Sequence, residues 1–208
     1  MNHIPKRRSI RLINYDYSQS GYYYITLCTQ NRELYFENNI IKKIIEKHWL
    51  NIPKRFNDVK LDEWVAMDNH LHGIIVINNG NNVDNNRRGR PMCLPANEHM
   101  ILTGEHTNEY TIPAGGHTGP PLQNKELNPT LGQIIQWFKT MTTNYYIQGV
   151  KNNNWPKFDK RLWQRNYYEH VIRDKKSLDK IREYIKFNPL NWDKDKNNPK
   201  NFKKIING

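Results

Sequence analysis

Residues 59–77 read VKLDEWVAMDNHLHGIIVI, and this stretch decides the fold that the sequence predicts. Residues 59–67 and 71–77 are rich in β-branched and other apolar residues, a composition that favours strands. Asp68 and Asn69 lie between the two runs, and these residue types accept the turn geometry that β-branched residues resist. We therefore expect an antiparallel hairpin over residues 59–77.

Two histidines stand at the start of the second strand of this hairpin. In a strand, residues i and i+2 point to the same side, so His70 and His72 would present two imidazoles together while Leu71 faces the other way. Imidazole binds several divalent ions, so the pair is half of a metal site, expected on the solvent-accessible face of the sheet. In a chain with eight histidines, two plain surface histidines are the equal alternative.

Strand and helix patterns also alternate on both sides of the hairpin. Residues 21–29 are aromatic and β-branched and predict a strand, whereas residues 38–50 have apolar positions at helical spacing behind a capping Asn. A capping box opens a helix over residues 130–145, and residues 177–187 form a last helix that stops at an Asn-Pro pair. The apolar face expected for the helix over 130–145 consists of Leu131, Ile134, Ile135, Phe138, Met141 and Tyr145.

The resulting order predicts the α+β class, with a ferredoxin-like or RRM-like split βαβ antiparallel sheet and helices on one face. Residues 161–172 would add a closing strand or a short helix. Residues 78–128 carry Asn runs and Gly-Gly and Pro-Pro pairs without any period, which indicates a long irregular insertion. We expect one domain over residues 1–208, with a basic N-terminal arm over residues 1–14.

The composition indicates a polyanionic partner. The chain has 32 Lys and Arg against 20 Asp and Glu, a net charge of +12, which favours nucleic acid first and an anionic membrane surface second. We expect no membrane span, because no apolar run approaches the roughly 20 residues needed to cross a bilayer. The two cysteines lie far apart and fit neither a disulfide framework nor a metal site, in agreement with a cytoplasmic protein.

A second candidate segment, LWQRNYYEHVIR over residues 162–173, brings aromatic, basic and acidic residues together. A tyrosine is protonated near neutral pH and needs a cation beside it to become a nucleophile. Glu169 and His170 are the nearest candidates for a third metal ligand, although either could instead orient a tyrosine. Burial of the aromatic residues in the core, or a stacking surface, is the alternative.

With these motifs in order, the chain resembles the REP-associated tyrosine transposases of the HUH (His-hydrophobe-His) group of bacterial single-strand transposases and nucleases. The landmarks are Arg7-Arg8-Ser9-Ile10-Arg11-Leu12, Tyr15-Asp16-Tyr17-Ser18, Tyr24-Ile25-Thr26, Met67-Asp68-Asn69-His70-Leu71-His72, Trp163-Gln164-Arg165-Asn166-Tyr167-Tyr168-Glu169-His170 and Tyr184-Ile185 with Asn188-Pro189. The resemblance implies that His70 and His72 hold Mg²⁺ or Mn²⁺ and that Tyr168 is the nucleophile. The third ligand stays open, with His170 as a candidate.

The activity implied is cleavage and rejoining of single-stranded DNA through a 5′-phosphotyrosine. The expected partner is single-stranded DNA or a hairpin with single-stranded flanks, in the cytoplasm of a bacterium, and a homodimer is left open. Basic residues expected to contact DNA are Lys6, Arg7, Arg8, Arg11 and Arg165.

Two other functions fit the same sequence. A split βαβ sheet with exposed aromatic residues could bind single strands without any chemistry, as RNA-recognition domains do. The two histidines could also activate water in a metal-dependent hydrolase, which would leave no protein-linked product. Within the resemblance, a mobile element and a domesticated nuclease that serves palindromic repeats are equally compatible with the sequence.

Overall fold

The computed structural model describes residues 11–12, 14–79 and 129–201, and these residues belong to one compact unit. Residues 80–128 of the expected insertion and most of the expected basic arm lie outside the described residues.

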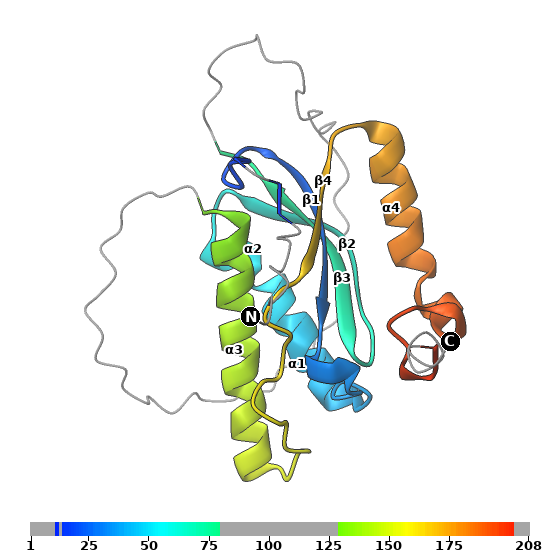
Figure 1. Cartoon of the computed structure of the whole chain (residues 1–208). Coiled ribbons are helices and arrows are strands. Elements are labelled where there is room, and N and C mark those ends of the chain that lie inside the picture. The colour runs from blue at the N-terminus through cyan, green and yellow to red at the C-terminus, as the bar shows by residue number, and fades with distance from the viewer. Residues whose placement is uncertain (1–10, 13, 80–128, 202–208) are drawn as a thin grey trace, which may run out of the picture. The chain divides into compact units, whose positions relative to one another are not determined.

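Four strands form a single antiparallel sheet with the spatial order β2-β3-β1-β4 (Figure 1). The strands are β1 (Gly21–Cys28), β2 (Val59–Ala66), β3 (His70–Ile77) and β4 (Tyr168–Ile172). This order is the split βαβ arrangement, so the predicted α+β class and the predicted hairpin are confirmed. The segment for which strand and helix were both open supplies the edge strand β4.

The helices begin where the sequence places capping residues. They are α1 (Asn39–Leu50), α2 (Ile52–Arg55), α3 (Leu131–Asn152) and α4 (Lys175–Phe187), with 3-10 turns η1 (Gln30–Arg32) and η2 (Pro189–Lys194). The Asn38 side chain accepts a hydrogen bond from Ile40 N, and Thr130 and Gln133 form the predicted capping box. Each cap satisfies backbone N–H groups that the first helical turn leaves without partners.

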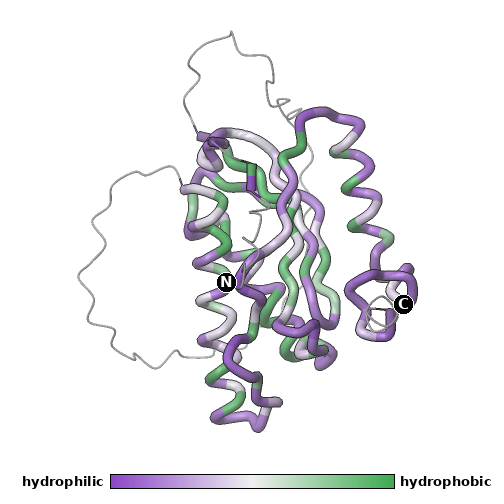
Figure 2. Tube along the Cα trace, viewed as in Figure 1, coloured by the Kyte–Doolittle hydropathy of each residue, from purple (hydrophilic) through white to green (hydrophobic). Residues whose placement is uncertain are grey.

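Helices cover both faces of the sheet, so the prediction of helices on one face is wrong. On the first face α1 and α3 pack on Tyr23 and Ile25 of β1. On the second face α4 buries Leu178 and Ile185 against Tyr22, together with other apolar residues of β3 and β4 (Figure 1). Figure 2 shows that α4 is otherwise largely hydrophilic, as expected for a helix that buries only one narrow stripe. The second face is therefore enclosed as well.

The second half of α3 buries a different set of residues from the one predicted. Met141 and Tyr145 are exposed, while Thr142 and Tyr146 are fully buried. Trp163 Nε1 donates to Thr142 Oγ1 at 2.9 Å, and the Tyr146 hydroxyl donates to a backbone carbonyl at 3.0 Å. Because both residues bond to the segment that follows α3, tertiary contacts select this stripe over the more apolar one.

Candidate metal centre

The two histidines of β3 lie on the face that α4 covers. Thr26 of β1 pairs with His72, and Cys28 pairs with His70, so all four side chains share this face. The predicted common orientation is confirmed, but the expected solvent accessibility is wrong. His70 is 0% and His72 is 1% exposed, and their rings contact Trp192 after α4 and Tyr184 of α4, respectively.

A third ligand-type side chain converges on the pair from the far end of the chain. His70 Nε2 and His72 Nε2 lie 3.0 Å apart, and Asp195 Oδ2 lies 3.6 Å from His70 Nε2. The ligand atoms of these three buried residues all lie within 4.8 Å of one another. Asp195 follows η2 directly, and nothing in the sequence analysis pointed to it.

The other ring nitrogen of each histidine is held by the protein. His70 Nδ1 lies 2.8 Å from Asn69 Oδ1. His72 Nδ1 lies 2.9 Å from both the Tyr24 hydroxyl and Thr26 Oγ1. Partners on Nδ1 fix the ring orientation of a metal-binding histidine and leave Nε2 for the ion.

Both imidazoles are neutral at physiological pH. Burial lowers the pKa of His70 to about 4, although the carboxylate of Asp195 opposes the shift. Burial and the neighbouring His70 also lower the pKa of His72 well below its ordinary value. Neutral imidazole is the form that binds metal, so at neutral pH a metal ion does not have to compete with the second ring proton of a charged histidine.

The donor set fits a divalent ion. Imidazole nitrogens bind a divalent ion such as Zn²⁺ at about 2.0–2.1 Å, so two of them on one ion lie about 2.8–3.4 Å apart, a range that includes the 3.0 Å found here. The carboxylate of Asp195 is held in place by Asn188 Nδ2 at 3.0 Å and by Asn197 N at 2.6 Å. His70, His72 and Asp195 are the residues that would hold such an ion.

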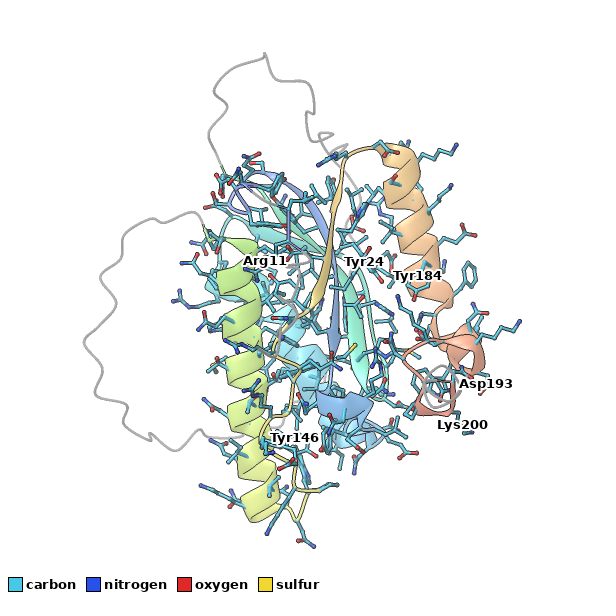
Figure 3. All side chains as sticks on the ribbon, viewed as in Figure 1. Arg11, Tyr24, Tyr146, Tyr184, Asp193 and Lys200 are labelled. Atoms are coloured by element: carbon cyan, nitrogen blue, oxygen red, sulfur yellow. The ribbon has the colours of Figure 1, made fainter. Side chains whose placement is uncertain are left out.

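A tyrosine hydroxyl of α4 lies next to one of the ring nitrogens that would face the ion. The Tyr184 hydroxyl lies 3.4 Å from His72 Nε2, and its ring is 6.4 Å from that of Tyr24, between the sheet and α4 (Figure 3). Burial and the carboxylate of Asp195 raise the pKa of Tyr184, so it is a neutral phenol without a bound cation. In the sequence, Tyr184 stood out only as part of the Tyr184-Ile185 landmark.

Tyr168 lies on the same face, at the first position of β4. It pairs with Thr26, its ring is 6.0 Å from that of Tyr24, and it is 47% exposed. Its neighbour Tyr167 belongs to the opposite face, where Arg11 and Lys139 contact its ring. The role of Tyr168 as the nucleophile remains a prediction.

The two residues expected to compete for the third ligand position lie elsewhere. Glu169 is buried on the opposite face of β4, and its carboxylate lies 3.8 Å from Arg11 Nε. His170 is exposed and pairs with Tyr24, outside the group of three converging ligands found among the described residues. Asp195 is therefore the third ligand-type residue that the fold brings to the histidines.

An open pocket of about 500 Å³ borders the site. Its lining includes Tyr168 and Tyr184 from the two flanking elements, Asp195 from the metal group, and the cations Lys194 and Lys196. Lys196 Nζ lies 5.9 Å from the ring centre of Tyr168. The pocket thus offers an anionic ligand both positive charge and tyrosine hydroxyls.

The expected DNA-contacting residues are only partly described. Lys6, Arg7 and Arg8 lie outside the described residues. Arg11 is exposed, donates to the Tyr167 hydroxyl at 3.2 Å and lies beside Glu169, while Arg165 is exposed in the loop before β4. Among the helices that the structure describes, none combines the length and apolar character required to cross a bilayer.

The fold and the converging His-His-Asp group define an α+β protein with a candidate divalent-metal site. No family model matches the sequence. An uncharacterized protein of Haemophilus influenzae is 36% identical over 203 residues, an alignment that covers 92% of this chain and 93% of that protein. The chain therefore belongs to the same protein family as the Haemophilus protein.

A similar fold is found among the solved structures, in a REP-associated tyrosine transposase bound to a REP hairpin, with a TM-score of 0.51 and 14% sequence identity. The similarity covers 86% of this chain and 72% of the other. At this level of identity the similarity concerns the fold.

Proposed function

We propose that this protein is an HUH-type, metal-dependent enzyme that cuts and rejoins single-stranded DNA through a tyrosine nucleophile. The observation that carries the proposal is the convergence of His70, His72 and Asp195 next to a tyrosine hydroxyl. The motifs in the sequence and the fold of the REP-associated tyrosine transposase support the same assignment.

The chemistry divides between the ion and the chain. A bound Mg²⁺ or Mn²⁺ would withdraw negative charge from the phosphate oxygens at the cleavage site. The tyrosine oxygen forms a bond to phosphorus while the bond to the 3′ oxygen breaks, leaving a free 3′ hydroxyl and a 5′-phosphotyrosine. Attack by another 3′ hydroxyl on the phosphotyrosine restores the strand and returns the proton to the tyrosine, so no ATP is consumed.

Three tyrosines line the pocket: Tyr24, Tyr168 and Tyr184. Tyr24 is buried and its hydroxyl lies against His72 Nδ1, so Tyr168 and Tyr184 are the candidates for the nucleophile. The resemblance in sequence favours Tyr168, whereas the 3.4 Å distance to His72 Nε2 favours Tyr184. We assign the nucleophile to Tyr184, because a nucleophile must reach the phosphate that the metal ligands face. Tyr168, with Lys196 beside its ring, would then contact the strand.

The choice of DNA as the substrate rests on the charge of the chain and on the similar solved transposase. The net charge of +12 favours a polyanion, and Lys194 and Lys196 bring part of this charge to the pocket. The solved transposase was bound to a REP hairpin, which supports hairpin DNA as the substrate.

The test is a cleavage assay on labelled hairpins with single-stranded flanks, taken from the DNA beside the gene. Wild type should cleave with Mn²⁺ and lose activity with chelator, and His70→Ala, His72→Ala and Asp195→Ala should all be inactive. His170→Ala, which changes an exposed histidine on the same face, is the control and should retain activity. Cleavage that survives chelation would refute the metal requirement.

A further inference from the structure

Asn69, which precedes the histidine pair in the β2–β3 turn, joins three segments that are far apart in the sequence. Its side chain is 0% exposed, although an Asn in a hairpin turn is usually at the surface. The amide contacts the carbonyl of Arg32, the carbonyl of Asn197 and the ring of His70. A buried amide with every polar atom bonded has one defined orientation.

The first consequence concerns His70. Asn69 Nδ2 donates to Arg32 O at 2.9 Å and to Asn197 O at 2.8 Å, and carbonyls can only accept. Asn69 Oδ1 therefore faces His70 Nδ1 at 2.8 Å, and since an amide oxygen also only accepts, the ring proton resides on Nδ1. The lone pair of His70 is thereby directed to Nε2, toward His72.

The second consequence concerns Asp195. Asn69 holds the backbone carbonyl of Asn197, and the backbone N–H of Asn197 donates to Asp195 Oδ1 at 2.6 Å. Arg32 Nε also donates to Asn197 Oδ1 at 3.3 Å, so the segment is attached at two points to the end of the sheet where β1 ends and β3 begins. The Asn69 side chain thus holds both His70 on β3 and the C-terminal segment that carries Asp195.

We propose that Asn69 is a positioning residue that preassembles the metal site, by setting the tautomer of His70 and by docking residues 195–197 beside it. The inference rests on the proposed function, because it assumes that the three converging side chains bind a metal. It goes beyond that function in assigning the preassembly of the site to a turn residue that does not bind the ion.

The experiment measures Mn²⁺ binding by calorimetry or electron paramagnetic resonance. Loss of a group that orients a metal ligand typically weakens affinity about 10–100-fold, and we expect Asn69→Ala to fall in this range. Asn38→Ala is the matched control, because Asn38 caps α1 by its side chain. It should lower the melting temperature and leave the Mn²⁺ affinity unchanged.

Two metal-free measurements separate the two roles. NMR should show a hydrogen-bonded Nδ1 proton on His70 in wild type and in Asn69→Asp, which retains an acceptor oxygen, but not in Asn69→Ala. Hydrogen exchange of residues 195–198 should be faster in both variants, because neither can donate to the carbonyl of Asn197. If Asn69→Ala does not fold, Asn69→Asp decides the docking role by exchange.

The outcomes distinguish this inference from the proposed function. If wild type binds no Mn²⁺, the proposed function fails, and the metal-free measurements alone decide whether Asn69 positions His70 and residues 195–198. If wild type binds Mn²⁺ and Asn69→Ala binds it equally well, with unchanged exchange, Asn69 has no positioning role and the metal site stands without it.

Discussion

Gly73, the residue after the histidine pair, should not tolerate a methyl group. A Cβ at this position would lie 2.4 Å from Trp49 Cζ2, whereas carbon atoms pack at about 3.5–4.0 Å, so β3 and α1 would have to separate by about 1 Å. Trp49 cannot turn away, because it is fully buried and packs edge-on against Phe138. Such overpacking costs about 1–3 kcal/mol.

Gly73→Ala should therefore lower the melting temperature by about 2–12 °C, since each kcal/mol corresponds to about 2–4 °C for a domain of this size. Circular dichroism in chelator measures the shift, and Mn²⁺ affinity should fall with it because β3 carries both histidines. Gly132→Ala is the matched control: a Cβ there meets its nearest atoms at 3.8 Å, so about 0.4–1 kcal/mol of stabilisation is expected. A Gly73→Ala protein as stable as wild type would refute the packing argument.

Three further predictions concern pH, the attachment of α4, and salt. Burial lowers the pKa of His70 from its ordinary value of about 6.5 to about 4. Between these two pH values the unfolded chain therefore binds more protons than the folded chain. The metal-free protein should lose stability between pH 6.5 and 4, by up to about 1.4 kcal/mol per pH unit, and His70→Asn should flatten this slope in acid-dependent urea titrations. Asp62→Asn removes the partner of Arg182, at 2.6 Å, and should cost about 0.5–1 kcal/mol in urea unfolding, while Asp179→Asn, a more exposed partner at 3.4 Å, should cost less. DNA affinity should fall steeply with salt and favour flanked hairpins over blunt duplex in titrations at several salt concentrations; equal affinity for the two DNAs would contradict this.

The sheet could be predicted because its determinants are local. The hairpin over residues 59–77 has strand residues on both sides of a turn pair, and the caps of α1 and α3 lie directly before apolar helical patterns. The placement of α4 was missed, because a narrow apolar stripe shows that a helix packs but not which face of the sheet it covers.

The site was predictable only in its local half. His70 and His72 are two residues apart on one strand, so strand geometry alone brings them together. Asp195 reaches them only through the path of the chain after α4, and no spacing in the sequence reports that contact. Tyr184 could not be singled out, because a tyrosine within an amphipathic helix is usually expected to pack against the core.

The central claim is most directly tested by identifying the residue that becomes attached to DNA. Wild type and the variants Tyr184→Phe, Tyr168→Phe and Tyr167→Phe are incubated with Mn²⁺ and a flanked hairpin labelled 3′ of the cut, then run on a denaturing gel. We predict a slowly migrating protein–DNA adduct for wild type and Tyr167→Phe, none for Tyr184→Phe, and a weaker adduct for Tyr168→Phe. Loss in Tyr168→Phe with retention in Tyr184→Phe would return the nucleophile to Tyr168, and cleavage by wild type without any adduct would contradict the tyrosine mechanism and indicate a hydrolase.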